Sequence, residues 1–151
     1  MDGFQSKLHD TFVEDYILQL ENKPLLYWTK DKNTYYTEEY ITNFIKKTVF
    51  ESEIIQINEM EKILNCSAVK KIILQLQTEL SEWNSFTQDF IYINKFKQGI
   101  KKLIIYVIEK NEYLISLKDL KQQIISLSTK NIHKQSIQRL FEINQFDTFV
   151  A

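Results

Sequence analysis

The chain has 151 residues, of which 44% are hydrophobic and 26% charged, which suits one globular domain or two very small ones. With 2 glycines and 1 proline, it lacks the turn residues that an all-β fold or a glycine-rich phosphate-binding loop requires. The single cysteine, Cys66, excludes a disulfide framework and a cysteine-based zinc site within the chain.

The formal net charge of -1 hides an uneven distribution of charge along the chain. Residues 1–94 carry 9 Lys/Arg and 15 Asp/Glu, a balance of -6, whereas residues 95–151 carry 10 and 5, a balance of +5. An acidic half joined to a basic half suggests two units with different partners, although ordinary solvated faces would give the same pattern.

The N-terminal part predicts a helix followed by a β-hairpin. Apolar residues recur at every fourth position and so share one helix face: Phe4, Leu8, Phe12, Tyr16 and Leu20. Pro24 is expected to end this helix. The apolar runs 25–28 and 35–36 flank a polar turn, as the strands of a hairpin do. Residues 1–36 are therefore predicted to form an arm of one helix and one hairpin.

A first winged-helix unit is predicted over residues 37–96. Thr37 can cap its first helix, and the β-branched segment 53–57 predicts a short strand. Two further helices follow, with Asn58 and Ser67 as their expected N-caps.

The end of this unit predicts a wing. A turn is expected at Asn84 and Ser85, directly after Trp83, and residues 90–93 predict a strand. The order of helix, strand, helix, helix and hairpin is that of a winged helix, which is a variant of the helix-turn-helix arrangement.

Residues 97–151 predict a second unit with the same order. A helix is expected over 97–110 and a minimal strand at 114–115. Ser116 and Ser128 are the expected N-caps of the next two helices.

The segment 146–151 predicts a final strand, which would be a truncated wing. The predicted fold is therefore mainly α with short β wings. It consists of tandem winged-helix units, over 37–96 and 97–151, preceded by the N-terminal helix and hairpin.

The sequence contains no set of residues that predicts catalysis. His9 and His133 lie far apart and lack neighbours at the spacings that metal sites prefer. The serines near His133 lack a strained nucleophile turn and an oxyanion-hole glycine. The chain is therefore predicted not to be an enzyme and to need no cofactor or metal.

Nucleic-acid binding is a common role of winged-helix units, because their second long helix can enter the major groove. In the first unit, Lys70 and Lys71 of that helix are offset by Glu79 and Glu82. The second unit offers a basic set of candidate phosphate contacts: Lys101, Lys102, Lys130, His133, Lys134 and Arg139. A solvated helix face that touches no nucleic acid is the alternative interpretation.

Aromatic residues predict a surface that binds a partner protein. The candidates are Tyr27, Trp28, Tyr35, Tyr36 and Trp83. Tryptophan and tyrosine contribute much of the binding energy of protein interfaces. The acidic surroundings of the first four disfavour the alternative role of stacking on single-stranded nucleic acid.

A family resemblance appears late in the chain. Residues 117–124, Leu127-Ser128 and residues 132–137 resemble the C-terminal winged helix of the middle subunit of replication protein A. Two such units in tandem look like the C-terminal region of the Stn subunit of the CST telomere complex, including a ciliate telomerase-associated version. Residues 20–27 resemble the segment that leaves the OB fold of that subunit, although the barrel itself is missing.

The resemblance implies a scaffold in telomere maintenance, located at telomeric chromatin in the nucleus. Such a scaffold would dock protein subunits such as telomerase or DNA polymerase α–primase, with weak DNA binding and no membrane insertion. Two alternatives remain open. One is a winged-helix regulator that binds duplex DNA, and the other is a tandem winged-helix subunit of an ESCRT-II-like sorting complex in the cytoplasm.

Overall fold

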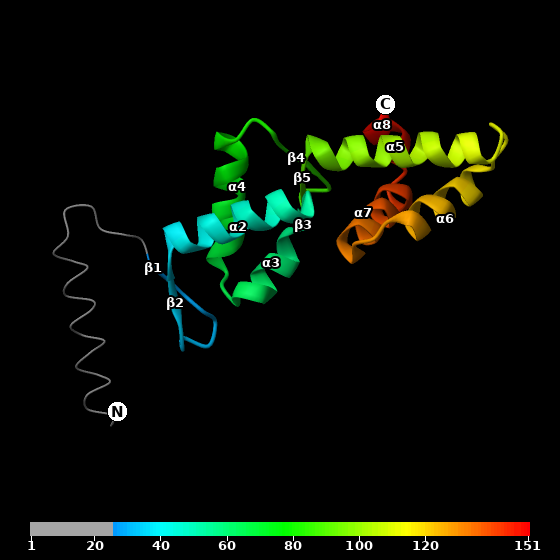
Figure 1. The fold of residues 1–151 in the computed structure, drawn as a ribbon. Helices are drawn as coiled ribbons and strands as arrows, with labels where there is room; N and C mark the ends of the chain where they lie inside the picture. The colour runs from blue at the N-terminus through cyan, green and yellow to red at the C-terminus, as the bar shows by residue number, and fades with distance from the viewer. Residues whose placement is uncertain (1–25) are drawn as a thin grey trace, which may run out of the picture.

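The computed structural model describes residues 26–151, and the predicted helix over residues 4–20 lies outside this range (Figure 1). Of the described residues, 63% are helical and 13% lie in strands of small antiparallel sheets. The predicted fold class, mainly α with short β segments, is confirmed.

The predicted hairpin is present, because β1 (Leu26–Trp28) pairs antiparallel with β2 (Tyr35–Thr37). The hydroxyl of Thr29 closes its turn. This hydroxyl donates to the carboxylate of Asp31 and accepts a hydrogen bond from the Thr34 N–H over 3.2 Å, while the Thr29 N–H donates to the carbonyl oxygen of Thr34 over 2.8 Å. The turn is therefore held by a side chain as well as by strand pairing.

The first unit has the predicted winged-helix order. Thr37 caps its first helix, since the Thr37 side chain accepts a hydrogen bond from the Tyr40 N–H over 3.1 Å. Its elements are α2 (Glu38–Ser52), β3 (Ile54–Gln56), α3 (Ile57–Leu64), α4 (Ala68–Glu79), β4 (Trp83–Phe86) and β5 (Phe90–Ile93). The strands form one antiparallel sheet in the order β3-β5-β4.

The predicted turn at Asn84 and Ser85 is wrong, because both residues lie within β4. The hairpin turns instead at Thr87 and Gln88, which have left-handed φ angles of 58° and 68°. The phenylalanine rings on the two sides of this turn stack with their centroids 4.8 Å apart. The stacked pair of Phe86 and Phe90 stabilises the last strand pairing, which explains why β4 continues through Asn84 and Ser85 to Phe86.

The predicted N-caps of the inner helices differ from those in the structure. Asn58 is not a cap, because α3 begins at Ile57, whose N–H donates to the carbonyl oxygen of Asp89 over 2.8 Å. That backbone contact satisfies a donor that a capping side chain would otherwise satisfy. Ser67 occupies the predicted N-cap position of α4, but its hydroxyl makes no capping hydrogen bond.

The second unit, from residue 94 onward, is built of helices. Ser116 caps one of them as predicted, because its hydroxyl accepts a hydrogen bond from the Asp119 N–H over 3.1 Å. The helices are α5 (Asn94–Lys110), α6 (Leu117–Leu127), α7 (Asn131–Glu142) and α8 (Phe146–Val150). This unit therefore keeps the helices of the predicted order without the strands.

Two predictions near these helices are wrong. Residues 114–115 form no strand, because the Leu114 N–H turns back to the carbonyl oxygen of Asn111 over 3.1 Å. Ser128 does not cap α7, which begins three residues later, at Asn131. Its hydroxyl donates instead to the carbonyl oxygen of Ile124 over 3.0 Å, at the end of α6.

The predicted final strand over residues 146–151 is also wrong, because this segment forms α8. Phe146 and Phe149 are both buried in the same core, and Phe146 stacks on Phe141 with ring centroids 4.2 Å apart. Residues three apart share one face of a helix but lie on opposite faces of a strand, so helical geometry is needed to bury both rings.

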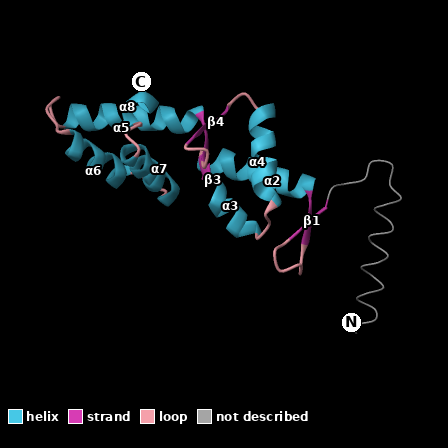
Figure 2. Ribbon diagram, turned by 180° about the vertical axis from the view of Figure 1, so that it is seen from behind, coloured by secondary structure: helices cyan, strands magenta, loops and turns pink. Residues whose placement is uncertain are grey.

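The sheet β3-β5-β4 lies between two groups of helices (Figures 1 and 2) and contributes to two hydrophobic cores. One face contributes Ile55 and Ile91 to a first core with α2, α3 and α4. The other face contributes Ile54 and Phe90 to a second core with α5, α6, α7 and α8. Successive residues of a strand point to opposite faces, so one sheet serves both units. The predicted boundary after residue 96 falls inside α5.

Candidate interaction surfaces

The hairpin carries a cluster of aromatic side chains. Trp28 is 46% exposed, and its ring meets that of Tyr35 edge-on with centroids 4.9 Å apart. Tyr36 stacks on Tyr40 of α2 at 5.1 Å. We call these four residues the hairpin surface. Tyr40 was not among the predicted binding residues, although its position four residues after Tyr36 could have indicated the stacked pair.

The hairpin surface is attached firmly to the first unit. Tyr27 packs against the first core, and burial raises the pKa of its phenol above the ordinary value, with Glu38 adding to the effect. The Lys30 N–H donates to the carbonyl oxygen of Asn65, beyond α3, over 2.7 Å. The hairpin backbone is thus held to the first unit by the packing of Tyr27 and by the Lys30 hydrogen bond. Because this backbone is already fixed, the exposed aromatic rings lose less entropy on binding.

Trp83 does not belong to the hairpin surface. Its side chain is 6% exposed and packs in the first core, where it lies opposite Ile93 of β5. The structure thus places this predicted partner-binding residue inside the protein. It also lines a groove beside Phe50.

The predicted basic residues come from two helices of the second unit. Lys101 and Lys102 are exposed on α5, which packs into the second core through Ile100 and Val107. The remaining four residues belong to α7 or its N-cap, on a helix that packs into the same core from another side.

Two of these basic residues bind backbone groups of the first unit. Lys130 Nζ donates to the carbonyl oxygen of Glu51 over 2.5 Å, and His133 Nε2 lies 2.7 Å from the carbonyl oxygen of Ser52. A carbonyl oxygen only accepts, so Nε2 of His133 carries the proton. The His133 ring also meets the ring of Phe96 edge-on at 5.1 Å.

We call these hydrogen bonds the α7–α2 contact. Glu51 and Ser52 are the last residues of α2, where carbonyl groups have no partner within the helix and the helix dipole is negative. The start of α7 therefore satisfies the end of α2 with donors from a lysine and a histidine. This contact joins the two units at a second place, next to the shared sheet.

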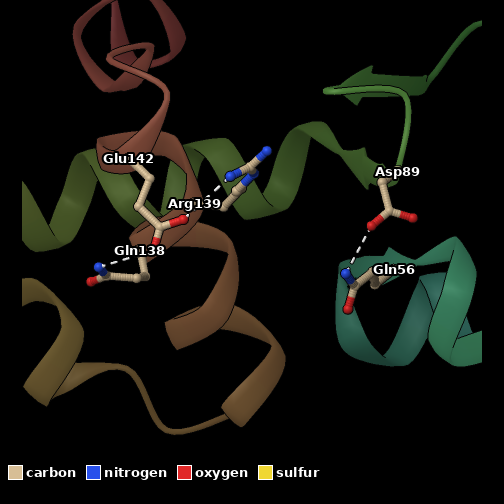
Figure 3. A network of polar contacts seen from close by, with 5 residues as sticks. All are labelled: Gln56, Asp89, Gln138, Arg139 and Glu142. Carbon is tan, nitrogen blue, oxygen red and sulfur yellow. Dashed lines mark hydrogen bonds and ion pairs between the residues drawn. The ribbon is translucent and has the colours of Figure 1, made fainter.

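A polar groove lies where α7 faces the first unit (Figure 3). Gln56 Nε2 donates to Asp89 Oδ2 over 2.8 Å on one wall. On the other wall, Arg139 Nη1 lies 3.3 Å from Glu142 Oε2, and Gln138 Nε2 lies 3.3 Å from Glu142 Oε1. Arg139, a predicted phosphate contact, is thus paired with a carboxylate beside two further carboxylates, Asp89 and Glu59.

The corner between α5 and α6 exposes large apolar side chains that the sequence interpretation missed. Leu114 is 87% exposed, and Tyr113 and Leu117 on either side are also exposed. The corner is closed by the Tyr113 N–H, which donates to the carbonyl oxygen of Ile108 over 2.8 Å. Tyr113 and Leu114 lie between the two helices and outside their apolar stripes, which was the signal available in the sequence.

Within residues 26–151, no three histidine, cysteine, aspartate or glutamate side chains lie close enough to hold a metal ion. In the same range, no helix combines the length and the apolar character needed to cross a membrane. Comparison of the chain with protein-family models, with curated proteins and with solved structures finds no match.

Proposed function

We propose that this chain is a non-enzymatic protein-interaction scaffold and that its hairpin surface binds a partner subunit. The α7–α2 contact carries the proposal. A winged-helix unit that reads duplex DNA inserts the N-terminal residues of its second long helix into the major groove. Here Lys130 and His133, at that position of the second unit, are bound to backbone carbonyl groups of the first unit.

The hairpin surface has the composition of a binding hot spot. Exposed tryptophan and tyrosine rings bury large areas on binding and lose little conformational freedom, because they have few rotatable bonds. Trp28 and Tyr40 are each about half exposed, while their partners Tyr35 and Tyr36 fix their orientation. A pre-oriented aromatic cluster of this kind favours a protein partner over a phosphate backbone.

The proposed setting is a telomere-end, telomerase or C-strand-synthesis complex in the nucleus. This part of the proposal rests on the resemblance of residues 117–137 to the replication protein A and Stn winged helices. That segment spans α6 and the first half of α7, whose start forms the α7–α2 contact. The partners would be protein subunits such as telomerase or DNA polymerase α–primase.

A DNA titration separates this proposal from a duplex-binding regulator. The full chain is titrated with a labelled DNA duplex at roughly 50 mM and 200 mM salt, and the fluorescence anisotropy is measured. A scaffold is expected to bind weakly, and Lys134→Glu and Lys101→Glu should change its affinity little. Tight binding that falls steeply with salt and is lost in Lys134→Glu would overturn the scaffold proposal in favour of duplex reading.

A further inference from the structure

An apolar groove lies on the first unit, between the second half of α2, the end of α4 and the sheet. Its volume is about 470 Å³, and its apolar lining consists of Val49, Phe50, Leu80, Trp83 and Ile93. Pockets of roughly 300–1,000 Å³ commonly hold ligands or anchoring side chains. Phe50 is 76% exposed at the rim, so the groove presents an aromatic ring to solvent as well as an apolar floor.

The chain itself contains a segment that matches this groove. Residues 4–20 carry an apolar residue at every fourth position, and the residues between these positions are mostly polar, with Val13, Ile17 and Leu18 as the exceptions. A helix with one apolar stripe needs a second apolar surface to bury that stripe. An isolated helix of this length is only marginally stable in water, so the predicted helix requires a partner surface.

The described structure begins at Leu26, close enough to the groove for residues 4–20 to reach it. Leu26 pairs with Thr37, the residue that caps α2. Phe50, at the far end of the groove, lies about 20 Å further along the helix axis at 1.5 Å per residue. Residues 4–20 would span about 25 Å as a helix, and residues 21–25 can add about 17 Å in extended form.

The charges of the two surfaces are complementary. Residues 1–21 carry Asp2, Asp10, Glu14, Asp15 and Glu21 against the single basic residue Lys7. On α2, Lys46 lines the groove, and Lys47 beside it is exposed with its Nζ 4.0 Å from a glutamate of the same helix. An acidic segment lying along α2 would therefore meet Lys46 in the lining and Lys47 one residue further along the helix, while Glu82 is the acidic residue of the lining.

We propose that the apolar stripe of residues 4–20 binds the groove formed by Val49, Phe50, Leu80, Trp83 and Ile93 in the same molecule. The tether makes this binding intramolecular, with an effective concentration in the millimolar range, so few buried side chains are needed to hold it. The groove is separate from the hairpin surface, so this proposal does not depend on the proposed partner-binding function.

Photo-crosslinking in the full chain tests the proposal. A benzophenone amino acid replaces Phe50, whose exposed ring tolerates substitution, and crosslinked peptides are identified by mass spectrometry. A mixture of isotope-labelled and unlabelled chains distinguishes crosslinks within one molecule from those between molecules. The expected result is a crosslink from position 50 to residues 4–20 of the same molecule.

Matched variants sharpen the test. Phe12→Asp places a charge in the apolar stripe and should lower the crosslink yield by about tenfold, whereas Ser6→Asp adds the same charge away from the stripe and should leave it unchanged. A benzophenone at Ile63, an exposed position on α3, should give no crosslink to residues 4–20. Crosslinks from position 50 to another molecule, or none to residues 4–20, would overturn the proposal.

Discussion

Replacing Ile54 by alanine should destabilise both units together, because this residue belongs to the shared sheet. Its side chain is 0% exposed and packs in the second core, while its neighbour Ile55 packs in the first core. Truncating a buried isoleucine to alanine costs about 2–5 kcal/mol, depending on how far the surroundings collapse into the cavity. The free energy of unfolding should therefore fall by an amount in the upper part of that range.

Urea denaturation followed by two probes measures this effect. In a Trp28→Phe background, Trp83 is the only tryptophan and reports on the first core, while circular dichroism reports on all helices. We expect Ile54→Ala to shift both transitions equally to lower urea. Ile63→Ala, at a position that is 62% exposed, should change stability by less than about 0.5 kcal/mol.

The reasoning would be refuted by separate transitions. If Ile54→Ala lowered the circular dichroism transition and left the fluorescence of Trp83 unchanged, the units would unfold independently. The shared sheet would then not couple them, and the two cores would be energetically separate despite their common strands.

Three further predictions concern local contacts. His133→Ala should lower the free energy of unfolding by about 1–3 kcal/mol in urea, because the carbonyl oxygen of Ser52 loses its donor. Phe149→Asp should destabilise the chain by more than about 3 kcal/mol in the same assay, whereas Thr148→Asp on the exposed side of α8 should not. The Thr29 hydroxyl and, next in size, the Asn33 backbone N–H donate to Asp31 and hold the pKa of its carboxyl below the ordinary value. The hairpin should therefore be most stable above the ordinary aspartate pKa, and it should lose order as the pH falls through the lowered pKa. Asp31→Asn should abolish this pH dependence, as followed by NMR of the hairpin amides.

Local patterns in the sequence predicted most of the helices and strands. The apolar periodicity of α5 and the caps at Thr37 and Ser116 are properties of neighbouring residues, and the structure has all three. The prediction failed where tertiary contacts decide the conformation. The segment at the C-terminus is apolar enough for a strand, but burying Phe146 and Phe149 in one core requires a helix.

The candidate site was predicted less well than the fold, because exposure depends on packing between units. Trp83 and Trp28 both lie in short strands, yet the first core covers one of them and leaves the other half exposed. Lys130 and His133 look like solvent-facing basic residues in the sequence. Their partners are backbone carbonyl groups about 80 residues earlier, and a side-chain pattern does not reveal such partners.

The most direct test of the scaffold account is affinity purification of the tagged full-length protein, with mass spectrometry of the proteins that accompany it. The account predicts recovery of telomerase, CST-like or DNA polymerase α–primase subunits. It also predicts their loss in the Trp28→Ser, Tyr35→Ser double variant, with recovery retained in the Lys101→Glu, Lys102→Glu control. Recovery of sorting-complex subunits, or loss of the partners only in the lysine variant, would contradict the account.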